Sequence, residues 1–227
     1  MKKYFAKEDG QGLVEYGLII SLVAIVSIVS LSGIAGGLSS KYDAFANVLE
    51  IEQLEDGSYL ITTEDGVEIY QKNLKLGRLI GDYTGDKKDI QIPSSMNGWA
   101  LKEIYQDVFK GKGLTSVAFD EGISLVQIHA RAFQNNELSS ISLPNGLEKI
   151  DVRAFYNNNL TEITLPTSVK TIQLNAFDGN DIRKVSIGSD VSVAANSFSN
   201  PGFADAYKSD NGGAGTYVYV NGNWVKQ

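Results

Sequence analysis

The feature that most restricts the fold of this chain is a motif that recurs in its second half. The motif begins with Leu-x-x-Ile-x-Leu or a close variant, and its first residue returns after steps of 24, 22 and 22 residues. Several other apolar positions return in the same register. A fixed period of this length is typical of solenoids, in which each repeat forms one coil that packs only against its neighbours. The positions that keep the register are Leu114, Leu138, Leu160 and Ile182; Ile128, Ile150, Ile172 and Val193; Ala132, Ala154 and Ala176; and Phe133, Phe155, Phe177 and Phe198.

Each repeat predicts a short strand, a return leg and an aromatic core. Leu-x-x-Ile-x-Leu alternates like a strand with one buried face, and Pro144 and Pro166 end it because proline has no N–H for a sheet ladder. The second Leu-x-x-Ile forms the return leg. Each phenylalanine then packs between those of the neighbouring coils, at about 1.5–3 kcal/mol per buried ring. Asn136, Asn158 and Asn180 each stand three residues after their phenylalanine. We expect them to bond the backbone of the adjacent coil, as an asparagine ladder.

The complete repeat, Leu-x-x-Ile-x-Leu-Pro-x-x-Leu-x-x-Ile-x-x-x-Ala-Phe-x-x-Asn, resembles the BspA-like leucine-rich repeats of bacterial surface proteins. The stretch Gly81-Asp-Tyr-Thr-Gly85 is similar to the first unit of such arrays. The resemblance therefore runs from about Gly81 to the C terminus. A different kind of solenoid is the alternative that the pattern leaves open.

A second feature, near the N terminus, is a long apolar run. No charged residue occurs between Glu15 and Lys41. A helix across this gap would be about 38 Å long, and a bilayer core is about 30 Å thick. The run is thus long enough to span a membrane, and the preceding Lys2, Lys3 and Lys7 favour a cytoplasmic N terminus. The Glu15 carboxylate would lie at the N-terminal end of this helix, where burying a charge in lipid is costly, so we expect a partner for its charge.

The stretch from Gly10 to Tyr16 reads Gly-Gln-Gly-Leu-Val-Glu-Tyr. Followed by the apolar run, it resembles the prepilin motif of type IVb pilins, the Flp family. The resemblance implies cleavage after Gly10 by a prepilin peptidase, with Gln11 as the new first residue and Glu15 and Tyr16 as assembly residues. Cleavage leaves an ammonium at Gln11, and a carboxylate one helical turn away can pair with such a group on a neighbouring subunit. That pairing would set the axial register of stacked helices.

Two alternatives remain open for this segment. One is a plain signal anchor whose Glu15 lies at the level of the lipid headgroups. The other is a secretory signal that is cut near Ala35, although the run is long for the apolar region of such a signal.

The sequence predicts an α+β chain of five parts. These are a leader over residues 1–10, an apolar helix over 11–48 with a bend at its glycine cluster near 33–37, a β meander over 49–78, the solenoid over 79–201 and a cap over 202–227. The meander rests on alternating runs broken by Asp56-Gly57 and Asp65-Gly66, which are strong hairpin signals. In the cap we expect a short helix near Phe203–Tyr207 and a hairpin that places Trp224 over the last coil.

Composition and motifs argue against catalysis. The chain has no cysteine, a single histidine and a formal net charge of −7 with scattered lysines and arginines, which disfavours nucleic acid as a partner. It has no Gly-x-Ser-x-Gly elbow, no phosphate loop and no cluster of metal ligands. His129 follows a return-leg isoleucine, so we expect it to point outward as a solvated side chain. We therefore expect no enzyme, no cofactor and no metal, although a glycosidase-type carboxylate pair is not excluded by sequence.

The outer side of the strands is the predicted binding face. Small hydroxyl side chains dominate it, and they serve either as a docking surface or only to keep the domain soluble. No aromatic anchor of the usual hot-spot type lies among them. The positions are Ser116, Ala118, Ser140, Ser142, Glu162, Thr164, Lys184 and Ser186.

Taken together, these features predict a structural or adhesive pilin-like subunit. Its partners would be prepilin peptidase, the membrane before assembly, other copies of itself in a filament, and an unidentified surface ligand. It would reside in the cytoplasmic membrane and then on an extracellular pilus or the cell surface. The alternatives are a single-pass surface adhesin that does not polymerise and a secreted repeat protein.

Overall fold

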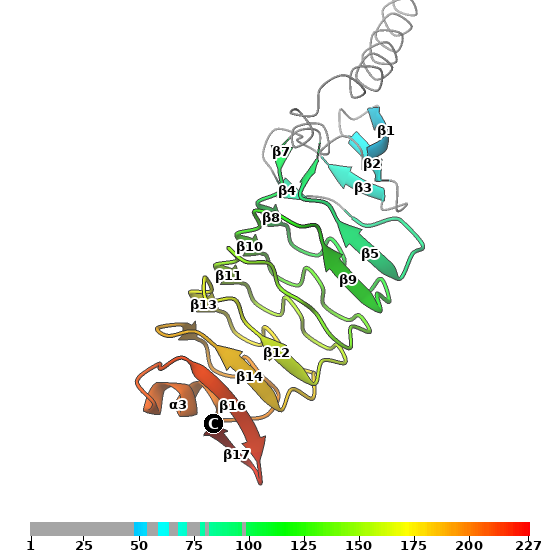
Figure 1. The fold of residues 1–227 in the computed structure, drawn as a ribbon. Coiled ribbons are helices and arrows are strands. Elements are labelled where there is room, and N and C mark those ends of the chain that lie inside the picture. The colour runs from blue at the N-terminus through cyan, green and yellow to red at the C-terminus, as the bar shows by residue number, and fades with distance from the viewer. Residues whose placement is uncertain (1–47, 54–58, 64–67, 72–77, 80–81, 97–98) are drawn as a thin grey trace, which may run out of the picture. The chain divides into compact units, whose positions relative to one another are not determined.

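The computed structural model describes residues 48–53, 59–63, 68–71, 78–79, 82–96 and 99–227 (Figure 1). The predicted leader, the apolar helix with its bend, and the Asp-Gly turns of the meander lie outside these residues. Within the described part of the chain, no helix combines the length and apolar character needed to cross a bilayer.

Three antiparallel strands form the first sheet. They are β1 (Val48–Gln53), β2 (Tyr59–Thr63) and β3 (Glu68–Gln71), paired in the order β1-β2-β3. This is the three-stranded meander that the alternating runs predict.

The repeats form coils with strands on two sides. One side carries β5 (Asp89–Ile92), β9 (Ser116–Phe119), β12 (Glu162–Thr164) and β14 (Lys184–Ile187) (Figure 1). The return legs form one parallel sheet in the order β15-β13-β11-β10-β8-β4, in which Ile128 pairs with Ile150 and Ile150 with Ile172. Its strands are β4 (Arg78–Leu79), β8 (Glu103–Ile104), β10 (Gln127–Ile128), β11 (Lys149–Ile150), β13 (Thr171–Ile172) and β15 (Ser192–Val193). A small hairpin, β6 (Ser95–Met96) with β7 (Trp99–Ala100), precedes the regular coils. The predicted solenoid with short parallel strands is thereby confirmed.

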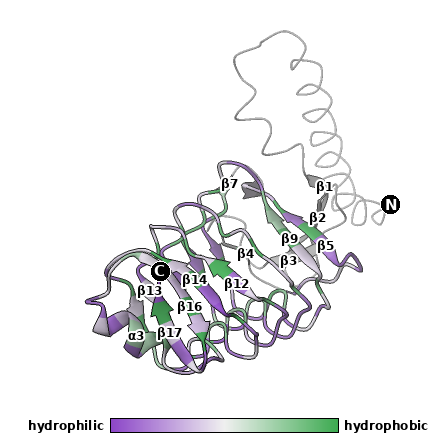
Figure 2. Cartoon of the chain, turned by 60° about the horizontal axis from the view of Figure 1, so that its bottom comes forward, coloured by the Kyte–Doolittle hydropathy of each residue, from purple (hydrophilic) through white to green (hydrophobic). Residues whose placement is uncertain are grey.

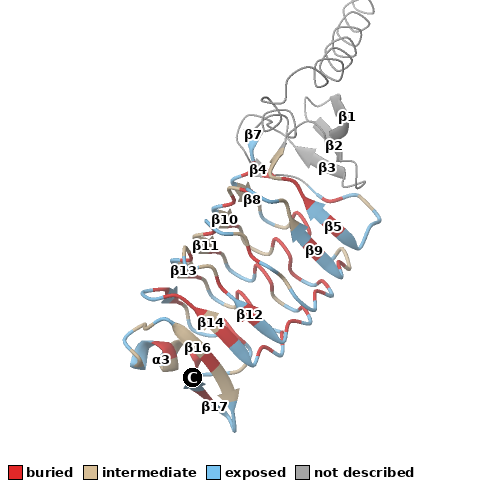
Figure 3. Ribbon diagram, viewed as in Figure 1, coloured by how far each residue is buried: buried red, intermediate tan, exposed pale blue. Residues whose placement is uncertain are grey.

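The core of the coils is a stack of phenylalanine rings. Phe109, Phe133, Phe155, Phe177 and Phe198 lie face to face, with ring centroids 5.1–5.3 Å apart and planes within 8° of parallel. Burial alternates along the strands, as the pattern of buried and exposed residues along β5 and β14 shows (Figure 3). Apolar and polar residues alternate along the coils in the same way (Figure 2). Each coil thus closes its core only against the coils beside it.

The asparagine ladder is present as predicted. Asn158 is 5% exposed, and its Oδ1 accepts a hydrogen bond from the Leu138 N–H of the preceding coil at 3.2 Å. Its Nδ2 donates to the Phe133 carbonyl of that coil and to the Phe155 carbonyl of its own coil, both at 3.0 Å. Asn136 and Asn180 repeat this arrangement in their coils.

Two turn positions in the coils take a left-handed backbone conformation, which the repeat pattern does not reveal. One lies three residues after the return-leg isoleucine or valine, with φ between 54° and 61° at Asp107, Arg131, Arg153, Asn175 and Asn196. The other lies two residues after the core phenylalanine, at Gly111, Asn135, Asn157 and Gly179. At Gly179 (φ 78°) a Cβ would lie only 2.8 Å from the backbone nitrogen of Asn157, so glycine is required there by both conformation and space.

The C-terminal segment caps the last coil with α3 (Phe203–Ser209), β16 (Gly215–Val220) and β17 (Asn223–Lys226). Trp224 is 8% exposed, and its indole N–H donates to the Asn200 carbonyl at 3.1 Å. The Tyr217 hydroxyl donates to Asp210 Oδ2 at 2.8 Å. Burial, and to a lesser extent this hydrogen bond, raises the pKa of Tyr217. The expected helix, hairpin and tryptophan contact are all present. In addition, β16 pairs antiparallel with β14, so the cap continues the strand sheet of the coils.

Candidate binding face

The strand face is defined here as the outward side of β5, β9, segment 139–143, β12 and β14. Seven of the eight predicted positions are exposed on it, and Ser186 is half-buried. The Ser186 Oγ lies 3.0 Å from the Thr216 Oγ1, because β16 of the cap pairs with β14 at this point. The cap therefore ends the strand face at Ser186. The seven exposed residues are Ser116, Ala118, Ser140, Ser142, Glu162, Thr164 and Lys184.

One pair of oppositely charged side chains lies on the strand face, and an aspartate at its other end has a neutral partner. Lys184 Nζ lies 3.2 Å from Glu162 Oε2 across two adjacent coils, at a site where both side chains are more than half exposed. At the other end, Gln91 Nε2 donates to Asp120 Oδ1 at 2.6 Å. The surface left between these pairs is uncharged and rich in hydroxyl groups, which suits hydrogen bonding more than electrostatic attraction.

The sheet under the strand face is interrupted at its centre. The motif Leu138–Leu143 predicts a strand like those of the other coils, but the segment 139–143 has no strand pairing. β9 pairs only with β5, and β12 pairs only with β14. The strand prediction is therefore wrong for this coil. A groove of about 760 Å³ lies between β9 with its following loop and residues 140–145. We call this groove the slot.

His129 lies on the return-leg sheet and is not the solvated side chain that the sequence predicts. Its side chain is 21% exposed, with Nε2 2.9 Å from Glu103 Oε2 and Nδ1 3.6 Å from Asp151 Oδ2. The ring also packs on Tyr105, with centroids 4.5 Å apart. Neighbouring coils supply residues on either side of the ring, which a reading of one coil alone does not show. Because the two carboxylates contact opposite ring nitrogens, the three groups cannot converge on one metal ion.

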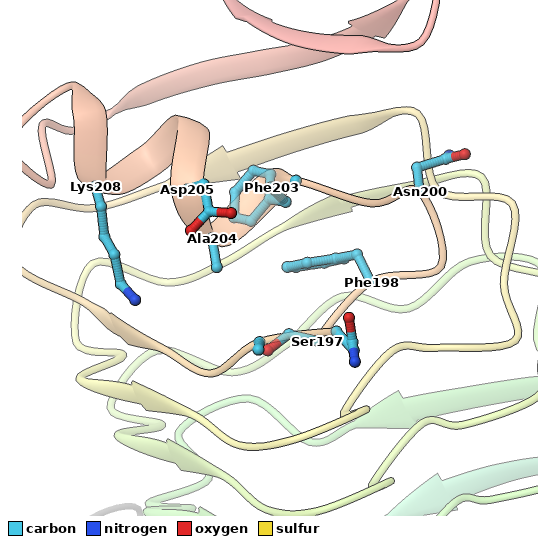
Figure 4. Close-up of a pocket in the computed structure, with 10 residues that line it drawn as sticks. Ser197, Phe198, Asn200, Phe203, Ala204, Asp205 and Lys208 are labelled. Atoms are coloured by element: carbon cyan, nitrogen blue, oxygen red, sulfur yellow. The ribbon is translucent and has the colours of Figure 1, made fainter.

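No cluster of three or more potential metal-ligating side chains occurs among the described residues. A second, smaller hollow of about 90 Å³ lies beside α3, between the last coil and the cap (Figure 4). Phe198 and Phe203 form its apolar wall, and Asp205 and Lys208 stand at its edge (Figure 4). Its size suits a few ordered waters rather than an organic ligand.

One ion pair outside the strand face is well formed. Arg131 donates two hydrogen bonds to the Asp107 carboxylate of the preceding coil, at 2.8 Å from Nε and 2.6 Å from an Nη nitrogen. The hydrogen bonds from the Arg131 guanidinium hold the pKa of Asp107 below its usual value. Both residues have a left-handed backbone conformation, which costs about 1–2 kcal/mol for a residue such as arginine. The pair helps to offset that cost.

This pair gives a pH-dependent prediction. A carboxylate whose pKa is lowered by folding contributes stability above its unfolded pKa of about 3.9, and this is lost as the pH falls through the folded pKa. Both side chains are more than a third exposed, so Asp107→Asn is expected to cost less than about 1 kcal/mol at pH 7. Urea unfolding of both proteins should show this difference shrinking below about pH 4.

Asp181→Asn is the matched control, because its partner Arg183 lies two residues away and both side chains are more than 60% exposed. It should leave the unfolding free energy unchanged at every pH. A deficit of Asp107→Asn that persisted unchanged in acid would show that the ion pair is not its source.

Comparison with known protein families agrees with the geometry of the coils. Residues 82–203, more than half of the chain, match the profile described as BspA type leucine rich repeat region, in six copies. The chain belongs to the BspA-type leucine-rich repeat family. The resemblance drawn from the repeat motif is thereby confirmed, and the stacked coils with their phenylalanine core are leucine-rich repeats of this type.

Among solved structures, the BspA-type repeat chain is similar to the crystal structure of the pneumococcal vaccine antigen PcpA, with 20% sequence identity and a TM-score of 0.37. The matched region covers 80% of this chain and 55% of that chain, so it spans about half of the antigen structure. Similarity at this level does not transfer the antigen's properties. No curated protein sequence matches the chain.

Proposed function

We propose that this protein is a pilin-like subunit that displays a leucine-rich repeat domain for adhesion or protein binding. The observation that carries the proposal is the stretch from Gly10 to Tyr16, with Glu15 at the mouth of an apolar run that has no charge before Lys41. Prepilin peptidase would cut after Gly10, and the freed helix would pack with those of other copies into a filament core. The helix then exchanges lipid neighbours for protein neighbours, so its burial is preserved.

Adhesion by the repeat domain is supported by the strand face. Solenoids commonly bind partners on the extended surfaces that their repeats create. Here the surface is polar, uncharged over most of its area, and extends over several coils as far as the cap, with the slot at its centre. It lacks a large aromatic anchor among its predicted residues, which favours many modest contacts over one dominant side chain.

A single-pass surface adhesin that does not polymerise is the second candidate, because the same apolar run is long enough to anchor a chain in a bilayer. A secreted repeat protein is the third. Mass spectrometry of the mature N terminus separates them. A start at Gln11 supports the pilin-like subunit, an intact Met1 supports the anchor, and a start near Gly36 supports the secreted form.

The substitution Glu15→Ala tests assembly directly. Removing the carboxylate removes the expected partner of the new N-terminal ammonium, so incorporation into filaments should fall by at least about tenfold, judged from the cost of an unpaired charge in an apolar setting. Quantitative immunoblotting of sheared filaments against the membrane fraction measures this ratio.

Glu8→Ala is the matched control, because Glu8 lies in the segment that cleavage would remove. It should leave filament incorporation unchanged. If Glu15→Ala subunits enter filaments at the normal level, Glu15 does not guide assembly and the pilin-like proposal loses its central residue.

A further inference from the structure

The interrupted sheet leaves backbone hydrogen-bonding groups without partners in the middle of the strand face. Among the described residues, no hydrogen bond reaches the backbone N–H or carbonyl groups from Ser139 to Leu143. On both sides of this segment the coils are joined, because Glu137 N–H bonds to the Leu114 carbonyl at 2.8 Å and Glu148 N–H to the Val126 carbonyl at 2.8 Å. The ladder therefore opens locally and closes again. Backbone groups of this kind are strong donors and acceptors that native structures almost always satisfy.

The register of the neighbouring ladders shows which groups face the slot. Asp120 N–H bonds to the Ile92 carbonyl of the preceding coil. Because successive residues of a strand direct their backbone groups to opposite edges, those of Val117 and Phe119 face the slot. One coil further on, Leu165 N–H bonds to the Ser186 carbonyl of the following coil. The equivalent alternation in segment 139–143 directs the backbone groups of Ser140 and Ser142 into the slot from the other side.

The coil that forms one wall of the slot is also longer than the coil after it. From Phe119 to Leu125 the chain advances six residues, whereas from the matching Leu143 to Leu147 it advances four. These two additional residues account for the 24-residue step, and the longer loop 120–124 follows β9 directly. The slot beside it has a volume of about 760 Å³, within the range of about 300–1,000 Å³ that is typical of ligand sites.

The charge of the slot is uniform. Of the described residues, only Asp120 and Glu121 line it with a charge, and none of its described lining residues is a lysine or arginine. Glu121 is exposed, and the described residues provide it with no ion pair. The slot thus offers two facing rows of backbone donors and acceptors with negative charge at one end.

We propose that the slot binds an extended, basic peptide segment of a partner protein by strand addition. An extended backbone is the ligand whose donors and acceptors alternate with the spacing of β9 and segment 139–143, and such main-chain pairing is an established source of peptide affinity. A lysine or arginine at the end nearest the loop would meet Glu121. This inference rests on the proposed function in one respect, since it assigns a partner class to the same binding face.

The test uses the purified full-length chain in mild detergent and a library of blocked hexapeptides, each with lysine at both ends and Val, Ile, Thr, Ser or Tyr at the four central positions. We expect members that bind with dissociation constants of about 1 mM or tighter. Hydrogen exchange should show the amides of Val117, Phe119, Ser140 and Ser142 becoming at least about tenfold more protected when a peptide binds. N-methylation of alternate amides of a selected peptide should weaken it about three- to tenfold in either register, because the amides of one register face β9 and those of the other face segment 139–143.

Two variants separate the slot from the rest of the face. Ala118→Trp places a large side chain in the slot and should weaken binding at least about tenfold. Thr164→Trp occupies the matching position on β12, two coils further on and outside the slot lining, and should leave binding within about twofold.

The proposal is overturned if no library member binds at about 1 mM, if binding protects amides elsewhere, or if both tryptophan variants lose binding equally. Concentration-dependent protection of the same four amides without any peptide would identify a second copy of this chain as the occupant, and that too would overturn it. None of these results bears on the mature N terminus, so failure of this inference is distinguishable from failure of the pilin-like assignment.

Discussion

Replacing Phe155 by alanine is expected to lower the free energy of unfolding by about 3–5 kcal/mol. The ring is fully buried and lies between Phe133 and Phe177, with both centroid separations at 5.2 Å. The substitution removes two stacked aromatic contacts, each worth about 0.5–1.5 kcal/mol beyond the area they bury. It also leaves a cavity, because backbone bonds such as Phe133 N–H to the Ala154 carbonyl, at 2.8 Å, hold the adjoining coils in place. Urea unfolding of the full-length chain measures the loss.

Leu174→Ala is the matched control for this experiment. Leu174 lies three residues before Phe177, but its side chain is 47% exposed. Its truncation should cost no more than about 0.5 kcal/mol. If the two variants are equally stable, the phenylalanine stack does not dominate the stability of the coils. The slope of the unfolding free energy against urea concentration gives a further result. A smaller slope for Phe155→Ala than for the native chain would show that the coils on either side unfold separately, as the nearest-neighbour energetics of repeat proteins allow.

The core of this fold is predictable because it repeats. Every coil must direct the same positions inward, so Phe133, Phe155 and Phe177 reveal themselves by recurrence even though each return strand is only two residues long. The asparagine ladder is predictable for the same reason. A buried amide that follows a buried ring by a constant interval has backbone groups of its own coil and of the preceding coil within reach.

The slot and the neighbourhood of His129 follow from relations between coils that a single repeat does not contain. Two additional residues after Phe119 are visible in the sequence, but the open ladder at residues 139–143 is not, since this segment also fails to pair with β12, which follows after a regular 22-residue step. His129 is positioned by Glu103 and Asp151, one coil away on each side. The residue types at the left-handed positions also mislead: Asn175 is a usual choice there, whereas Arg153 is not. The alternation of apolar and polar residues predicts which side chains of the strand face are exposed. It does not predict which backbone groups of that face are hydrogen-bonded.

The asparagine ladder gives the second large effect, in Asn158→Ala. The Phe133 and Phe155 carbonyls each keep one amide partner, from Asn136 and Asn180 at 3.0 and 2.9 Å. The buried Leu138 N–H loses the side-chain acceptor that it has in the native chain. An orphaned buried donor costs about 1–3 kcal/mol, and each of the two lost donations costs about 0.5–1.5 kcal/mol. We therefore expect the free energy of unfolding to fall by about 2–6 kcal/mol, with hydrogen exchange at Leu138 accelerated beyond that of its neighbours.

Asn159→Ala provides the comparison, because this exposed neighbour contributes its backbone N–H to the Leu138 carbonyl and that bond survives the change. It should shift stability by no more than about 0.5 kcal/mol. Asn158→Leu sharpens the argument further. Leucine fills a similar volume with apolar atoms but offers no acceptor, so it should not restore what alanine loses. If leucine restores the unfolding free energy, filled volume rather than hydrogen bonding is what residue 158 contributes to stability. The asparagine ladder would then follow from the stacking of the coils and would not cause it.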